Sequence, residues 1–152
     1  MIRPAEPEDY VIITNLWLET SLQAHNFISA SYWQEMLPLV KNEYIPAAQT
    51  FVFEDRHRIK GFISLMPGNY IGALFVKKEF QEHGIGNKLL EYVRRHKPNL
   101  NLKVFSKNKH ALRFYQRSGF KIVATDFNDD TGEEELLMAW AKGCKNSCKT
   151  AS

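Results

Sequence analysis

The chain has 152 residues, of which 44% are hydrophobic and 24% charged, as is ordinary for a single globular domain. Its net charge of +3 comes from the C-terminal tail, because residues 1–141 carry 17 basic and 17 acidic side chains. A neutral folded part argues against a nucleic-acid-binding surface, and no stretch approaches the roughly 18 apolar residues of a membrane span. No basic-then-apolar leader opens the chain, so we expect a cytoplasmic protein.

The apolar periodicity predicts eleven elements in the order strand, two helices, three strands, helix, strand, helix and two strands. The expected ranges are 1–5, 11–22, 30–44, 50–54, 59–66, 71–76, 87–96, 100–105, 108–118, 121–127 and 135–140. The second helix should bend near Pro38. The three central strands should be antiparallel, whereas 100–105 should lie parallel to 71–76 because a helix joins them.

The tail after Ala141 lacks apolar periodicity, so we expect residues 142–152 to be disordered and basic, with Lys142 among its three lysines. Cys144 and Cys148 lie in this tail without a nearby histidine cluster. We therefore expect neither a metal site nor a disulfide from them.

The segment from residue 70 to 90 combines a strand, a glycine-containing loop and a helix start. The first N–H groups of a helix have no partner inside it, and glycine lets a ligand approach the backbone closely. Gly84 and Gly86 thus predict a phosphate cradle, although an ordinary glycine-rich turn is an equal alternative on these residues alone. A P-loop is excluded because Asn87 follows Gly86, and a dinucleotide fingerprint because Leu89 replaces its third glycine.

Two motifs together resemble the signatures of the GNAT N-acetyltransferase superfamily, in its single-domain bacterial type. Gln81, Gly84 and Gly86 match the coenzyme A pyrophosphate loop, Gln/Arg-x-x-Gly-x-Gly/Ala. The second signature, Asn-x-x-Ala-x-x-Phe-Tyr-x-x-x-Gly-Phe, is matched by Asn108, Ala111, Phe114, Tyr115, Gly119 and Phe120. The local chemistry agrees, because asparagine is a good N-cap and glycine suits the left-handed residue after a helix end. The resemblance covers roughly residues 2–140, nearly the whole chain.

The resemblance implies an α/β (α+β) GNAT fold over residues 1–141, with a mixed, mostly antiparallel sheet of six to seven strands and helices on both faces. It implies an enzyme that transfers the acetyl group of acetyl-CoA to a primary amine by direct attack. The acceptor could be a protein lysine, an N-terminus or a small amine, and the sequence does not decide among them. A non-catalytic acyl-CoA-binding regulatory or sensor module on the same fold is the alternative. No metal, nucleic acid or membrane is expected as a partner, and the chain could be a monomer or a homodimer.

The resemblance also assigns site residues. The backbone of Leu74, Phe75 and Val76 would pair with the pantetheine arm and direct an N–H at the thioester oxygen. The pyrophosphate would be held by the loop residues Gln81, Glu82, His83, Gly84, Ile85, Gly86 and Asn87. The pantetheine or adenosine side would be bound by Asn108, Ala111, Phe114 and Tyr115.

Tyr115 falls at the family's general-acid position. A phenol is protonated at neutral pH and can donate its proton to a departing thiolate. Burial of Tyr115 as a core aromatic on an amphipathic helix is the alternative. The general base is not identified, because residues 69–73 hold no acid, and the candidates are Glu19, His25, Glu54 or a chain of water molecules.

The acceptor site is expected near the first two helices and their connecting loop, as in the resembled family. The candidate substrate-binding residues are His25, Phe27, Trp33 and Glu54, with core packing as the alternative for Trp33. Six acids crowd the last hairpin: Asp126, Asp129, Asp130, Glu133, Glu134 and Glu135. They indicate either a solvated turn or a surface that attracts a cationic amine.

Overall fold

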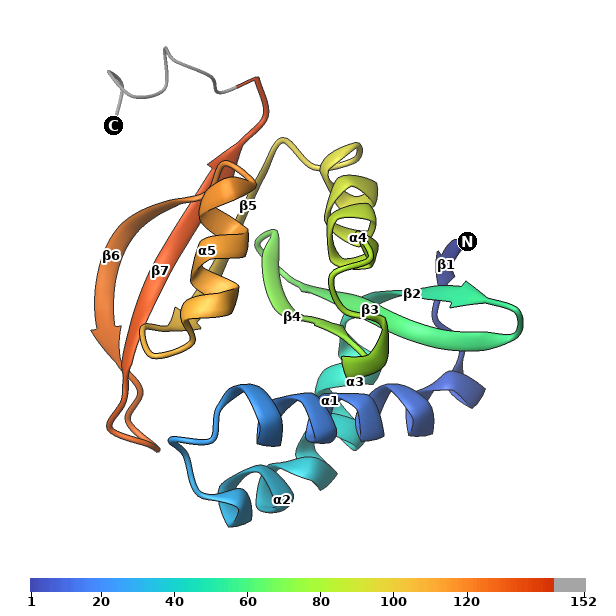
Figure 1. Cartoon of the computed structure of the whole chain (residues 1–152), viewed down its shortest axis with the longest axis horizontal. Coiled ribbons are helices and arrows are strands. Elements are labelled where there is room, and N and C mark those ends of the chain that lie inside the picture. Colours follow the sequence, from blue (N-terminus) through green and yellow to red (C-terminus); the bar gives the residue numbers. More distant parts are fainter. Residues whose placement is uncertain (144–152) are drawn as a thin grey trace.

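The computed structural model describes residues 1–143 and shows a seven-stranded sheet with helices on both faces (Figure 1). The elements are β1 (Ile2–Pro4), η1 (Pro7–Asp9), α1 (Tyr10–Ala24), α2 (Ala30–Leu39), η2 (Val40–Tyr44), α3 (Ile45–Ala47), β2 (Gln49–Asp55), β3 (Arg58–Met66), β4 (Tyr70–Val76), η3 (Lys78–Phe80), α4 (Ile85–Arg94), β5 (Asn99–Phe105), α5 (Lys109–Arg117), β6 (Lys121–Phe127) and β7 (Glu134–Ala141). The sheet order is β1-β2-β3-β4-β5-β7-β6, and only the β4–β5 pair is parallel. The predicted fold class and the predicted parallel pair are confirmed.

The predicted second helix changes its character where the sequence places a proline. The α-helix α2 includes Pro38 and ends at Leu39, and a π-helical turn, η2, continues to Tyr44. Because proline has no N–H to donate, the regular ladder of i→i−4 bonds is interrupted there. The expected bend near Pro38 therefore takes the form of a widened turn.

The core lies on both faces of the sheet because side chains alternate along its strands. On one face, Phe62 packs with Ile13 of α1. On the other face, Ile63 packs with Leu89 and Leu90 of α4. All five of these side chains are fully buried, and each contributes ~1.5–3 kcal/mol to stability. The two helical layers are thus fixed to the sheet on either side.

Strands β4 and β5 part soon after they meet, which opens the sheet between its two halves (Figure 1). They pair only at Tyr70 and Ile71 of β4. The next residue, Gly72, is the extra residue of a bulge, because Ile71 and Ala73 face consecutive residues of β3. A bulge bends the strand that carries it. Pairing with β5 therefore stops where β4 turns away, and the helices α4 and α5 face each other across the gap.

The described chain ends just beyond β7. The N–H of Lys142 donates to the carbonyl of Pro98 at 2.7 Å, and Gly143 is the last described residue. The tail was expected to begin at Lys142, and its remaining part, with Cys144 and Cys148, lies outside the described residues. Among residues 1–143, no helix is both long and apolar enough to cross a membrane.

Candidate active site

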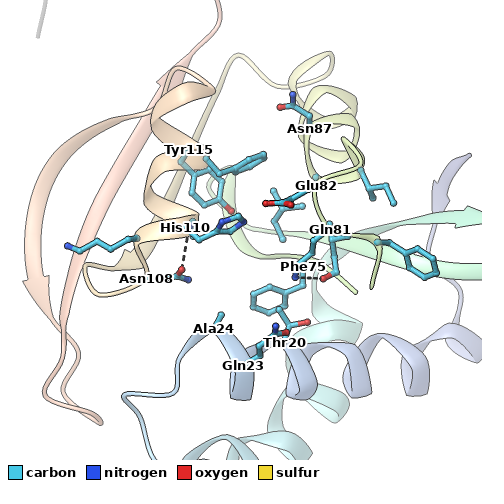
Figure 2. A pocket seen from close by; sticks show the side chains of 18 of the residues that line it. Thr20, Gln23, Ala24, Phe75, Gln81, Glu82, Asn87, Asn108, His110 and Tyr115 are labelled. Carbon is cyan, nitrogen blue, oxygen red and sulfur yellow. Dashed lines mark hydrogen bonds between the residues drawn. The ribbon is translucent and has the colours of Figure 1, made fainter. Parts of the chain in front are cut away.

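A cavity of about 610 Å³ lies where β4 and β5 part, between α4 and α5 (Figure 2). Every predicted cofactor-binding residue lines it except His83. Sequence reasoning missed a further group of lining residues, namely Thr20, Gln23, Ala24, Phe80, Lys107, Lys109, His110 and Arg117. The first three belong to the last turns of α1, and nothing local in the sequence indicates that this helix end reaches the cavity.

The loop from β4 to α4 lines the cavity together with the first turn of α4, whose N–H groups have no acceptor inside the helix. Gly84 is the N-cap of α4 and has a φ of +81°, a conformation that favours glycine. The side chain of Gln81 donates from Nε2 to the carbonyl of Val76 at 2.9 Å and so fastens the loop to the end of β4. A Cβ on Gly86 would lie 3.5 Å from Phe114 of α5, an ordinary van der Waals distance, so the start of α4 lies close to the ring of Phe114.

The second motif shapes the opposite wall. Asn108 is the N-cap of α5, and its Oδ1 accepts a hydrogen bond from the N–H of Ala111 at 3.2 Å. Gly119 follows the helix with a φ of +95°. Both local predictions from this motif are confirmed.

Tyr115 of α5 lines the cavity although its side chain is largely buried. Its ring packs edge-to-face against Phe114 and Phe120, with centroid distances of 5.2 and 5.4 Å. Burial raises the pKa of Tyr115 well above its usual value, because the phenolate is poorly solvated there. The side chain is therefore kept in the protonated form that a proton donor requires.

The rim of the cavity is mainly basic. Lys107, Lys109 and Arg117 come from the start and the end of α5, and Glu82 is the one carboxylate among the described lining residues. Figure 2 shows Glu82 and Gln81 on the α4 side, across the open space from His110. Cationic side chains and free helix N–H groups are the partners that phosphate groups need.

His25 and Trp33 are core residues and not part of an open acceptor surface. Their side chains are only 8% and 7% exposed, and their rings stack with centroids 5.3 Å apart. Phe27 and Phe105 pack around His25 in edge-to-face contacts. Burial lowers the pKa of His25 to about 4. This geometry argues against His25 as the general base, because it is a weak base and its Nε2 faces Asn108 at 3.1 Å.

Glu54 does not line the cavity, because it lies on β2, next to the edge strand β1. Its carboxylate accepts from Nε of Arg3 at 3.1 Å, and Arg3 also pairs with Asp9 at 2.8 Å. The guanidinium lowers the pKa of both carboxyl groups. Glu54 therefore fixes strand β1 to β2, a role that the sequence did not indicate. Glu19 is exposed and does not line the cavity.

The acidic hairpin between β6 and β7 lies near α2. Burial raises the pKa of Tyr32, and the negative charges of Asp130 and Glu135 raise it further. Glu135 has the same effect on Tyr70 at the start of β4, where burial is again the larger cause. Both carboxylates therefore lie near Tyr32, whereas only Glu135 acts on Tyr70. Glu133 is already engaged, because it forms an ion pair with Lys107 at 3.0 Å.

A sheet that opens between two parallel strands, with a glycine-capped helix on one side and a buried tyrosine on the other, is the arrangement that the two sequence motifs led us to expect of an acetyltransferase. The sequence profile described as the acetyltransferase (GNAT) domain matches residues 19–134. The chain belongs to the GNAT acetyltransferase family.

Curated and solved relatives agree with this assignment. The chain is 39% identical over 140 residues to the peptidyl-lysine N-acetyltransferase YiaC of Escherichia coli K12, covering 92% of this chain and 96% of YiaC. It is 30% identical to YjaB of the same organism, also called a peptidyl-lysine N-acetyltransferase, covering 90% of this chain and 92% of YjaB. The solution structure of apo YjaB superposes with a TM-score of 0.81 over 92% of this chain and 96% of that structure. An aminoglycoside 6′-N-acetyltransferase complexed with coenzyme A shares the fold, with a TM-score of 0.67, 17% identity and coverage of 95% and 98%.

Proposed function

We propose that the protein acetylates the ε-amino group of lysine side chains in other proteins. Two relatives that cover most of this chain bear the name of peptidyl-lysine N-acetyltransferases. The observation that carries the proposal is the cavity between α4 and α5, which is lined by the glycine-capped start of α4 and by Tyr115 of α5. The carboxylates near Tyr32 add a feature that suits a cationic acceptor.

Each end of the cavity has a separate task in this proposal. The N–H groups around Gly84 and the basic rim hold the phosphates of acetyl-CoA. The edge of β4 at Leu74–Val76 is not paired with β5, so its backbone groups are available to the amide groups of the pantetheine arm. The thioester supplies the activated acetyl group, and one of the β4 N–H groups stabilises negative charge on its oxygen.

Tyr115 then acts as the general acid. A phenol is protonated at neutral pH, and Tyr115 lines the cavity, so we assign its hydroxyl as the donor of the proton to the leaving sulfur. None of the three candidate bases from the sequence is free beside it, since Glu19 and Glu54 do not line the cavity and His25 is engaged by Asn108. Among the described residues the lining contains Glu82 and His110, and we propose that the proton that the ammonium group loses passes to water or to one of these two side chains.

The test is a panel of acceptors with acetyl-CoA, scored by release of the free thiol and by mass spectrometry of the products. The panel contains a lysine peptide blocked at its N-terminus, the same peptide with arginine in place of lysine and a free N-terminus, a polyamine and an aminoglycoside. We expect turnover on the first peptide, with the added acetyl group on its lysine. Preference for another acceptor would reject the lysine assignment, and absence of turnover with all four would reject amine acetylation.

A further inference from the structure

The cap of α5 fixes the orientation of one amide group. Oδ1 of Asn108 must face the helix, because it accepts from the N–H of Ala111 at 3.2 Å. The amide nitrogen therefore points the other way, and it lies 3.1 Å from Nε2 of His25. An amide nitrogen can only donate, so Nε2 accepts and the ring proton of His25 is on Nδ1.

His25 is itself held in place on every side. Its backbone N–H donates to the carbonyl of Ser21 at 2.9 Å, and its carbonyl accepts from the N–H of Ile28 at 3.0 Å. Its ring stacks on Trp33 and contacts the edges of two phenylalanines. No charged group is among the causes of its lowered pKa, which burial alone explains.

The hydrogen-bonding balance of this ring points to a role for Nε2. Nδ1 of His25 is buried and has no partner among the described residues, which destabilises the fold. A phenylalanine would fill the same aromatic cluster without that cost. Packing alone therefore does not explain a histidine at position 25, whereas an acceptor for the Asn108 amide does.

We propose that His25 is a positioning residue that orients Asn108, so that the second N–H of the Asn108 amide stays available to a ligand in the cavity. Asn108 lines that cavity, and one of its two amide hydrogens is left over after His25 has taken the other. The ligand group that this N–H would meet is an amide carbonyl, which the pantetheine arm contains. This assignment rests on the proposed placement of acetyl-CoA.

Two variants of His25 separate positioning from packing. His25→Gln replaces Nε2 by an amide oxygen that can still accept, whereas His25→Phe keeps the ring and removes the acceptor. Positioning predicts that H25F raises KM for acetyl-CoA about tenfold, the effect of one lost hydrogen bond, while H25Q stays within about twofold. Both should retain kcat within about twofold. Packing predicts the reverse order, because H25F preserves the aromatic cluster and H25Q does not. That reverse order, or an unchanged KM in H25F, would overturn the proposal.

The contact can also be measured without turnover. In ¹⁵N NMR at neutral pH, His25 should show a protonated Nδ1 and an unprotonated Nε2, and H25F should shift the side-chain NH₂ signals of Asn108. A protonated Nε2 in the parent protein would refute the assignment. Calorimetry of acetyl-CoA with the parent tests the proposed function separately, since absent binding would reject that function while the NMR result still judges the contact.

A variant on the other side of the contact covers the case in which H25F does not fold. Asn108→Asp keeps the capping oxygen but cannot donate to Nε2. The carboxylate should instead favour the charged imidazolium, so the pKa of His25 followed by NMR should rise. Lys107 lies over the ring of Phe27, which packs against His25, and its charge is paired with that of Glu133. An unchanged pKa in N108D would show that the two side chains do not interact.

Discussion

At the scale of single residues, Tyr115 carries the chemistry that the fold is proposed to perform. Tyr115→Phe removes the proton but keeps the ring between Phe114 and Phe120. We expect kcat to fall by ~10²–10⁴, while the affinity for acetyl-CoA hardly changes. Single-turnover rates and calorimetry would measure the two quantities independently.

A matched control is available on the other helix. Tyr92 of α4 is half-buried against Phe51 and does not line the cavity between α4 and α5, so Tyr92→Phe should leave kcat unchanged. Equal losses of kcat in the two variants would mean that removal of either hydroxyl lowers kcat by disturbing the folded structure. An unchanged kcat in Y115F would mean that water or another group donates the proton to the leaving sulfur.

His25 should also give the protein a pH-dependent stability. Its pKa is about 4 in the folded protein and 6.5 in the unfolded chain, so the unfolded state binds more protons between these values. The contribution of neutral His25 to the free energy of unfolding is therefore fully present above pH 6.5, and this contribution is lost as the pH falls toward 4. Between pH 7.5 and 4.5 the parent should lose roughly 2.5 kcal/mol more free energy of unfolding than H25F. Urea denaturation at both pH values measures this difference, and equal losses would contradict it.

At the scale of elements, the loop before α4 depends on the conformation of one glycine. Gly84→Ala keeps the side chain small, and a Cβ there meets no atom within 4 Å, so the strain comes from the positive φ alone. Gly132 in the β6–β7 turn has a φ of +73° and equally open surroundings. Both alanine variants should lose about 1 kcal/mol of stability.

Only the loop variant should change the binding of acetyl-CoA. Relief of the strain at Gly84 shifts the N–H groups at the start of α4, whereas the β6–β7 turn lies outside the cavity lining. Calorimetry measures the affinity for acetyl-CoA in G84A and in G132A. Because both variants should lose the same stability, a difference in affinity reports on the loop before α4 alone. Equal affinities of the two variants for acetyl-CoA would show that this loop does not hold the phosphates.

The sequence predicts those parts of the site that local rules determine. The N-cap Asn108, the left-handed Gly119 and the loop around Gly84 are all encoded within a few neighbouring residues, and the structure confirms their local geometry. The bulge at Gly72 is different. It follows from the register of β4 against β3, a pairing between strands that periodicity along one strand does not show. The gap that holds the cavity therefore could not be predicted from the pattern along one strand.

Long-range contacts account for the misplaced acceptor residues as well. Glu54 is the last residue of the predicted strand 50–54, and its partner Arg3 is 51 residues away in the chain. His25 meets Asn108 across 83 residues. Residue type indicated a titratable loop histidine, but its surroundings, which decide its pKa, come from α2 and β5.

At the scale of the whole molecule, the neutral charge of residues 1–141 hides two regions of opposite sign. The charged residues that line the cavity are mostly basic, and the β6–β7 hairpin near Tyr32 is acidic. A polyanionic donor and a cationic acceptor would thus be attracted to different places. The average composition excluded a nucleic-acid surface but could not indicate this division, because it depends on how the elements fold together.

The separation of charges can be tested by neutralising the acidic region. Asp130→Asn combined with Glu135→Gln should raise KM for a lysine peptide by up to about fivefold per charge and weaken its dependence on salt, because exposed charges attract a cationic acceptor through water. KM for acetyl-CoA should stay unchanged. Asp129→Asn provides the matched control, since it removes one charge from the same hairpin but does not influence the pKa of Tyr32. Steady-state kinetics at low and at high salt would measure both constants. If D129N has the same effect per charge as the double variant, the attraction is a general property of the hairpin, and if only KM for acetyl-CoA changes, the acceptor does not approach over this surface.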